Sequence, residues 1–163
     1  IALCNAYNFA EALSASAAGK PIMLVGSKLS DEQIAYLKTH NGKKFYLIGG
    51  SDVVSKNVEN EVSKLGNVER LEGSDRFATS RVVAEKFFAG EHKRVYLTYG
   101  LNFPDGLCAG VLCAIDNSPL LLVSNSNLYE AAAYISKAKV QKCFVLGGDD
   151  LISNEAANKL LKK

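Results

Sequence analysis

Internal repetition is the feature that most constrains how this chain can fold. Four sequence blocks recur in the same order, first at a spacing of about 94 residues and later at about 98. The matched blocks are 5–13 with 99–107, 21–25 with 119–123, 45–50 with 143–148, and 51–55 with 149–153. A period this long indicates two tandem domains of one fold, because solenoid repeats usually span roughly 20 to 50 residues. The change in spacing predicts an insertion in the second copy near 113–116.

Short apolar segments alternate with segments of helical spacing in both copies. Strands are predicted at 1–4, 22–25, 45–48, 95–98, 120–123 and 143–146, and helices at 9–18, 30–40, 55–65, 74–88, 103–115, 128–137 and 153–161. The strand segments are apolar throughout, as expected for strands that are covered on both faces. This alternation predicts the α/β class, with tandem parallel sheets flanked by helices and right-handed crossovers.

The second copy contains a segment that the first copy lacks. Residues 68–89, which precede the strand at 95–98, have no counterpart ahead of Ile1. We therefore divide the chain near Gly66, into a repeat truncated at its N-terminus (1–66) and a complete repeat (67–163). The missing part should hold a short strand and a long helix. A neighbour must cover the gap, because a small domain with an incomplete core is marginally stable. We expect the chain to be an interior piece of a longer protein.

The composition excludes several classes of protein. Hydrophobic content of 48% with 22% charged residues is typical of a globular chain with a real core. The net charge of +2 is too mild to indicate binding to nucleic acid or to a membrane surface. No apolar run approaches the roughly 18 residues that span a bilayer. The four cysteines form no CxxC pair, and we interpret them as small buried hydrophobic residues. His40 and His92 each stand alone among polar residues, so we predict neither a metal site nor a cofactor.

The glycine pairs that follow two predicted strands allow two interpretations. Gly49-Gly50 and Gly147-Gly148 could let backbone amides approach a phosphate at a helix N-terminus. Neither GxGxxG nor a Walker motif is present, and Asp52 and Asp149 put carboxylates where a phosphate would lie. The alternative is a tight turn between strand and helix. The sequence also lacks a GxSxG elbow, an HExxH motif and a Cys–His arrangement, so an enzyme would depend on Asp75, Asp105 and Arg76 alone.

Two short polar turns, each opening a helix, hold the candidate site. Ser74 is predicted to cap the helix at 74–88, with Asp75 near its positive end. Asn102 is predicted to cap the next helix, with Asp105 in its first turn. Both turns follow strands, at the edge where open α/β sheets bind ligands. The candidate ligand-binding residues are Ser74, Asp75, Arg76, Asn102 and Asp105.

Arg76 has two possible roles at this edge. It can be held by Asp105 or Asp75 in a partly buried bidentate pair that fixes the two turns together. Alternatively, its guanidinium can face an anionic ligand. The two roles are compatible if a carboxylate orients the arginine.

The ordered motifs resemble the clostridial-type cell wall binding repeat, the second type. They are Arg70-Leu71-Glu72-Gly73-Ser74-Asp75-Arg76-Phe77-Ala78-Thr79, then Asn102-Phe103-Pro104-Asp105-Gly106-Leu107, Pro119-Leu120-Leu121-Leu122-Val123 and Leu146-Gly147-Gly148. The resemblance covers the whole chain in duplicate and implies Rossmann-like or flavodoxin-like sheets. In that family the repeats usually come in threes. The first copy departs from the motif, with Ala10-Glu11 in place of Pro-Asp and no GSDR element. We therefore expect a complete site only in the second copy.

The resemblance implies a non-catalytic module that retains a secreted surface protein, such as an S-layer protein, at a Gram-positive wall. The implied partner is an anionic secondary wall polymer, with further repeats or an effector domain in the full-length protein. Copies of the chain could also associate as a homo-oligomer. The rival function is part of a wall-lytic amidase in which the repeats only target the catalytic domain, and two lone histidines argue against a zinc amidase within the chain. A flavodoxin-like nucleotide binder would need a phosphate loop that the sequence lacks.

Overall fold

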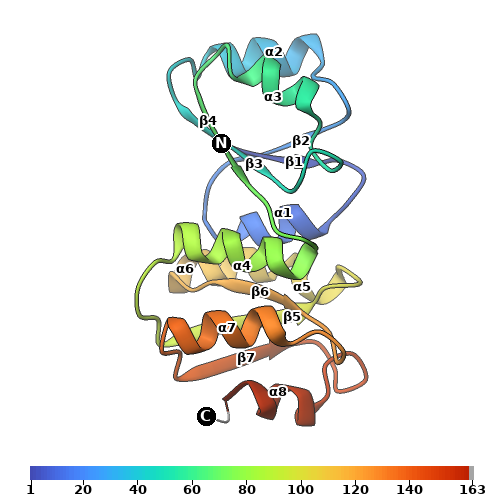
Figure 1. Ribbon diagram of the computed structural model, residues 1–163, viewed down its shortest axis with the longest axis vertical. Coiled ribbons are helices and arrows are strands. Elements are labelled where there is room, and N and C mark those ends of the chain that lie inside the picture. The colour runs from blue at the N-terminus through green and yellow to red at the C-terminus, as the bar shows by residue number, and fades with distance from the viewer. Residues whose placement is uncertain (162–163) are drawn as a thin grey trace.

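Two parallel sheets, one above the other along the long axis, form the frame of the molecule (Figure 1). The computed structural model describes residues 1–161. The first sheet has the strand order β2-β1-β3-β4 and the second has the order β6-β5-β7. Every pair of neighbouring strands within these sheets is parallel. The predicted α/β class with parallel sheets is confirmed.

The elements follow one another in regular alternation. The strands are β1 (Ala2–Asn5), β2 (Ile22–Val25), β3 (Lys44–Ile48), β4 (Asn67–Leu71), β5 (Arg94–Tyr99), β6 (Leu120–Val123) and β7 (Lys142–Leu146). The helices are α1 (Ala10–Ser16), α2 (Asp31–Lys38), α3 (Lys56–Val62), α4 (Arg76–Phe87), α5 (Pro104–Leu107), α6 (Ala109–Asp116), α7 (Tyr129–Lys137) and α8 (Asn154–Leu161). In the described chain, no helix combines the length and the apolar character that crossing a bilayer requires.

The strand that opens the second repeat lies in the first sheet. β4 pairs with β3 along its whole length, from Asn67 beside Lys44 to Leu71 beside Ile48. The described part of the second sheet has no strand at the equivalent position beside β7. The division of the repeats near Gly66 stays a prediction, whereas the sheets divide after Leu71.

Helix α1 joins the two sheets because its faces pack on both. Leu13 lies in a buried cluster with Phe77 of α4 and Leu122 of β6. Ala15 lies in another cluster with first-sheet side chains, including Ile48. The helix is short, but small residues let both neighbours approach it closely. The two repeats therefore share buried apolar clusters to which both contribute side chains.

Three predicted helix starts are confirmed by side-chain caps. Ser30 accepts a hydrogen bond from the Gln33 amide and completes a capping box, while Ser55 and Ser153 each accept an amide from the first turn that follows. These hydroxyls satisfy backbone donors that have no partner within the helix. The serine pattern therefore locates three helices correctly from sequence.

Two predicted caps are wrong. The cap of α4 is Asp75, one residue after Ser74, and its Oδ1 accepts from the Ala78 amide at 2.8 Å. Asn102 lies one residue ahead of the α5 cap, and its Oδ1 accepts only from the Phe103 amide at 2.9 Å. The predicted helix at 103–115 is divided into α5 and α6 around Cys108, which is exposed rather than buried.

Two leucines at equivalent strand positions, Leu122 of β6 and Leu24 of β2, differ in how far they are exposed. Leu122 of β6 is 1% exposed. Helix α4 lies over it, and the Ser80 Oγ accepts a hydrogen bond from the Leu122 amide at 3.1 Å. Leu24, at the same position of β2, is 50% exposed. No helix of the described chain covers Leu24 as α4 covers Leu122, so this face of β2 is open.

Alanine substitution of these two leucines should give unequal losses of stability. Leu122→Ala removes a fully buried side chain, so the free energy of unfolding should fall by about 2 to 5 kcal/mol. Leu24→Ala should cost roughly 1 kcal/mol or less, because half of that side chain already faces solvent. Urea denaturation of both variants beside the wild type measures the difference. Equal losses would contradict the assignment of an open face to β2.

Candidate functional site

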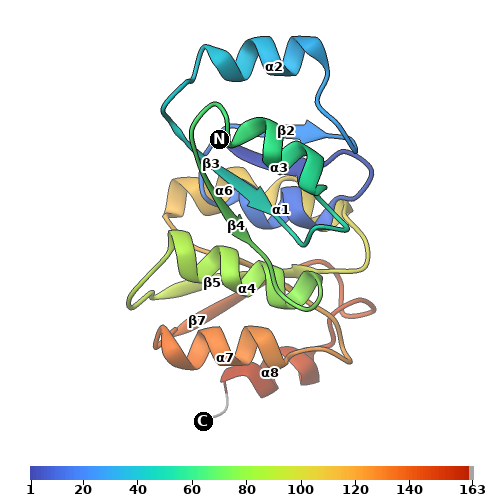
Figure 2. The ribbon, with the colours of Figure 1, turned by 45° about the horizontal axis from the view of Figure 1, so that its top comes forward.

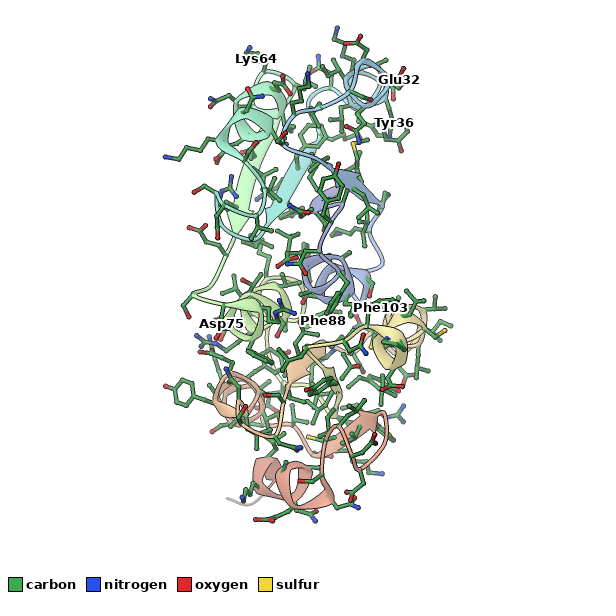
Figure 3. All side chains as sticks on the ribbon, turned by 90° about the vertical axis from the view of Figure 1, so that its right-hand side faces the viewer. Glu32, Tyr36, Lys64, Asp75, Phe88 and Phe103 are labelled. Atoms are coloured by element: carbon green, nitrogen blue, oxygen red, sulfur yellow. The ribbon has the colours of Figure 1, made fainter. Side chains whose placement is uncertain are left out.

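The candidate residues lie where strands end and helices begin. The strands of both sheets point to the same side of the molecule (Figure 2), so the strand-to-helix connections of both repeats lie on one edge. Figure 3 looks onto this edge and labels Asp75 ahead of α4 and Phe103 ahead of α5. We call it the carboxyl edge. It includes 6–9, 26–30, 49–55, 72–75, 100–103, 124–128 and 147–153.

Asp75 has a structural role that uses both carboxylate oxygens. Oδ1 caps α4, and Oδ2 accepts a long hydrogen bond of 3.5 Å from the Asn127 side chain in the loop after β6. The neighbouring Ser74 is exposed. A carboxylate at this position also interacts favourably with the positive end of the helix. Asp75 therefore fixes the start of α4 relative to the second sheet.

Arg76 is held by an aromatic ring and a carbonyl rather than by a carboxylate. Its Nη1 donates to the Gly100 carbonyl oxygen at 2.9 Å, and its guanidinium carbon lies 5.5 Å from the centre of the Phe9 ring. Phe9 in turn contacts Phe103, with ring centres 5.6 Å apart. Cation–π contacts of this kind contribute about 0.5 to 2 kcal/mol. Within residues 1–161, no carboxylate lies within ion-pair distance of Arg76, so the expected pair with Asp105 or Asp75 is not formed.

The two acidic motif residues pack against the glycine turns of their own repeats. Asp105 is exposed and lies against Gly147, where an added Cβ would be 2.8 Å from Asp105 Oδ2. Glu11, its equivalent in the first repeat, lies near Gly49, where an added Cβ would be 3.3 Å from Glu11 Cγ and closer still to Val53. Both glycines have positive φ, 104° at Gly49 and 125° at Gly147, so a side chain there would be strained as well as crowded. The glycine turns thus hold acidic side chains, as the tight-turn interpretation favours.

Glu11 is the site residue that sequence reasoning missed. Its side chain is buried, and its Oε2 has no hydrogen-bond partner among the described residues. Burial raises the pKa of this carboxyl, while its own backbone amide and the positive charge of Arg76 act in the opposite direction. The alignment of Glu11 with Asp105 was a usable signal. The alignment could not predict that Arg76 of the second repeat contacts Phe9 of the first repeat.

The site is therefore composite, since Arg76 at the start of α4 belongs to the second repeat while Phe9 and Glu11 belong to the first. Asn102 and Asp105 lie on the same edge but contact different neighbours. The edge is rich in carboxylates, with Asp52, Glu72, Asp149 and Asp150 in its connections. In residues 1–161, no three His, Cys, Asp or Glu side chains gather closely enough to hold a metal ion. Burial raises the pKa of both Cys4 and Cys113 to about 12, so these thiols are poor nucleophiles at neutral pH.

This geometry suits recognition better than covalent chemistry. An oriented guanidinium, exposed carboxylates, an amide and two aromatic rings can bind hydroxyl and anionic groups of a ligand.

Comparison with known proteins gives a family match over both repeats. A family model described as Cell wall binding domain 2 (CWB2) matches residues 1–59 and 70–157. The chain is 29% identical over 160 residues to N-acetylmuramoyl-L-alanine amidase LytC of Bacillus subtilis (strain 168), covering 94% of this chain and 32% of that protein. It is 31% identical over 149 residues to the Amidase enhancer of the same organism, covering 90% of this chain and 20% of that protein.

Solved structures give a similar match. Cwp8 from Clostridium difficile has a TM-score of 0.85 at 26% identity, over 99% of this chain and 30% of that chain. Cwp6 from Clostridium difficile has a TM-score of 0.80 at 23% identity, over 99% of this chain and 27% of that chain, which shows the same fold. The chain spans about a third or less of each of these four proteins.

Replacing Glu11 should reveal its raised pKa as a dependence of stability on pH. Because the folded state binds the Glu11 proton more tightly than the unfolded state, stability is lost as pH rises above the ordinary carboxyl pKa. Glu11→Gln should therefore be more stable than the wild type at pH 7, and the difference should shrink as pH falls toward 4. Melting temperatures between pH 4 and 8 measure this, with Asp105→Asn as the exposed control. A Glu11→Gln variant that is less stable at pH 7 would refute the raised pKa.

Substitutions of Arg76 should separate the contribution of its planar guanidinium group from that of its positive charge. Arg76→Ala loses the hydrogen bond to Gly100 and the contact with Phe9, so the free energy of unfolding should fall by about 1 to 3 kcal/mol. Arg76→Lys keeps the charge without the planar group and should lose less. Chemical denaturation provides the measurement. A wild-type unfolding curve for Arg76→Ala would show that these contacts do not stabilise the fold.

Proposed function

The chain belongs to the cell wall binding domain 2 family, and from this premise we propose that it is a non-catalytic anchoring module. Its role is to hold a secreted surface protein at the cell wall by binding an anionic wall polymer. The family match over both repeats is the observation that carries this proposal. The relatives also support it, because the matched segments make up only part of longer proteins.

The carboxyl edge supplies groups suited to a polymer of sugar units with anionic substituents. We propose that Ser74, Asp75, Asn102 and Asp105 bind hydroxyl groups of the polymer. Carboxylates accept hydrogen bonds from hydroxyls, and amides and hydroxyls can both donate and accept them. Arg76 supplies a cationic fork whose orientation is fixed by Gly100 and Phe9. Phe103 is 45% exposed and gives a ring on which a sugar face can pack. These contacts are few, so a single site of this kind binds weakly.

Repetition compensates for weak individual sites. Binding of one repeat to a polymer raises the effective concentration of the next, and avidity can exceed single-site affinity by about 100- to 10,000-fold. Further repeats or an effector domain of a longer protein, and association of copies of the chain, belong to the same proposal. Placement at the cell surface follows from the function, since the polymer is found there.

The second candidate function is targeting within a wall-lytic enzyme. The similarity to N-acetylmuramoyl-L-alanine amidase LytC favours it, and the chain covers 32% of that protein. In this version the chain does the same binding, while the catalytic groups belong to another part of the longer protein. The two candidates therefore differ in what is attached to the module.

Binding to purified Gram-positive walls tests the proposal. The chain should sediment with walls at low salt, and extraction of the secondary polymers should abolish this binding. Binding should weaken as salt rises from about 0.05 to 0.5 M, because exposed ionic contacts are screened over about a Debye length. The fraction that sediments, measured across the salt series, gives the result. Equal binding to extracted walls would contradict polymer recognition.

A parallel assay addresses catalysis. The chain should release no N-acetylmuramoyl-linked peptide from the same walls, and any such release would overturn the non-catalytic role. Arg76→Ala should weaken binding by several-fold, whereas Arg81→Ala, which removes a guanidinium paired with Glu85 and Glu130 on the side of α4, should not.

A further inference from the structure

Charge is segregated between the two edges of the sheets. The helix-to-strand connections, on the left of Figure 1, form the edge opposite to the candidate site, and we call it the amino edge. Basic residues of these connections and of the adjoining helix ends and strand starts are Lys20, Lys38, Lys43, Lys44, Lys64, Lys86, Lys93, Arg94, Lys137, Lys139 and Lys142. The carboxyl edge is instead rich in carboxylates. A net charge of +2 for the whole chain therefore hides two surfaces of opposite sign.

Helix dipoles explain only part of this segregation. Lys38, Lys86 and Lys137 lie in the last turns of helices, where a cation interacts favourably with the negative end. Lys20, Lys43 and Lys93 do not, because they lie in the connections. These three side chains are exposed, and none has an ion-pair partner within residues 1–161.

Ion pairs through Glu69 link a basic residue of the first sheet, Lys44, to Lys86 at the end of α4, in the middle of the amino edge. Lys44 Nζ lies 2.5 Å from Oε2 of Glu69, and Lys86 Nζ lies 2.6 Å from Oε1 of the same carboxylate. One negative charge is thus shared by two cations, which leaves an excess of positive charge. The residue after Lys86 is Phe87, and Lys20 Nζ lies 5.4 Å from the centre of its ring.

A hollow between the repeats lies in the middle of this edge. Its volume is about 120 Å³, and Gly19, Lys20, Phe87, Phe88 and Asn117 are among the residues that line it. Lys20 and the Asn117 amide can both donate hydrogen bonds. The volume is sufficient for a group the size of a phosphate, since one liquid water molecule takes up about 30 Å³.

The basic surface continues along the second sheet. Asp116, next to Asn117, pairs with Arg94 at 3.0 Å. Arg94 and Lys142 are neighbours in register at the starts of β5 and β7, and the Lys142 amide donates to the Lys93 carbonyl oxygen at 3.0 Å. Lys93 and Lys142 are exposed, and neither has an ion-pair partner in the described chain. The amino edge therefore presents cations along both repeats.

We propose that this amino-edge strip, from Lys43 and Lys44 through Lys20 to Lys93 and Lys142, is the surface that binds the anionic groups of the wall polymer. The inference rests on the proposed function, and it assigns the polyanion to the edge opposite the motif residues. A strip that crosses both repeats suits a repetitive chain of phosphate or carboxylate groups. The carboxyl edge keeps the proposed contacts with hydroxyl groups of the polymer, because its carboxylates accept hydrogen bonds from hydroxyls. Arg76 then contributes a single ionic contact at that edge.

Two triple variants with the same net charge test the assignment. Lys20→Gln, Lys93→Gln and Lys142→Gln together remove three charges from the strip. Lys28→Gln, Lys56→Gln and Arg81→Gln together remove three charges elsewhere, two of them beside the carboxyl edge and one in the middle of α4. Binding to unextracted walls and to long-chain inorganic polyphosphate is measured across a salt series. Melting temperatures confirm that both proteins fold.

The strip variant should bind both materials on the order of tenfold more weakly at 0.1 M salt, with a shallower salt dependence, because fewer counterions are displaced. The control variant should bind like the wild type. If the wild type binds walls and the two variants lose affinity equally, the strip is not the site. If the wild type does not bind walls at all, the proposed function fails, whatever the polyphosphate result. Tighter binding of the wild type to duplex DNA than to polyphosphate would overturn the choice of a wall polymer.

Discussion

The packing of α1 between the two sheets is the interaction on which the rest of the structure depends. Leu13 and Ala10 lie against Phe77 and Leu122 of the second repeat, while Ala15 remains in the core of the first. Because α1 follows directly from β1, this packing also fixes the loop that carries Phe9. Arg76 reaches that loop from the start of α4. The geometry of the candidate site is thus a result of how the repeats pack, and neither repeat contains it alone.

Sequence reasoning recovered what local patterns determine. Apolar segments and serine caps gave the α/β class, the parallel sheets and most helix starts. Ser74 was a wrong cap because two adjacent residues can both cap a helix, and only the backbone path after Gly73 selects Asp75. The partner of Arg76 was also wrong. The motif places Arg76 and Asp105 in one repeat, but Arg76 bonds to Gly100 of that repeat and packs on Phe9 of the other repeat, a contact that spacing cannot encode. Glu11 was missed although its alignment with Asp105 was a usable signal, because the fold sets its burial and the nearby charge of Arg76.

The opposite charges of the two edges follow from the parallel architecture. When all strands point one way, all connecting helices point back, so their positive ends gather at the carboxyl edge and their negative ends at the amino edge. Side chains that complement these ends, such as Asp75 and Lys86, then collect on opposite sides. The unpaired lysines of the connections add to this arrangement. A nearly neutral protein can therefore present an extended cationic surface without a basic composition.

The position of β4 has a consequence for how such a chain can be divided. The predicted second repeat (67–163) begins at this strand, but the strand completes the sheet of the repeat before it. The predicted boundary between the repeats and the boundary between the sheets therefore differ by one strand. A fragment cut at the predicted repeat boundary would deprive the first sheet of its edge strand and leave β4 without the strand that it pairs with. Recombination between such genes should preserve the protein when it exchanges segments after Leu71.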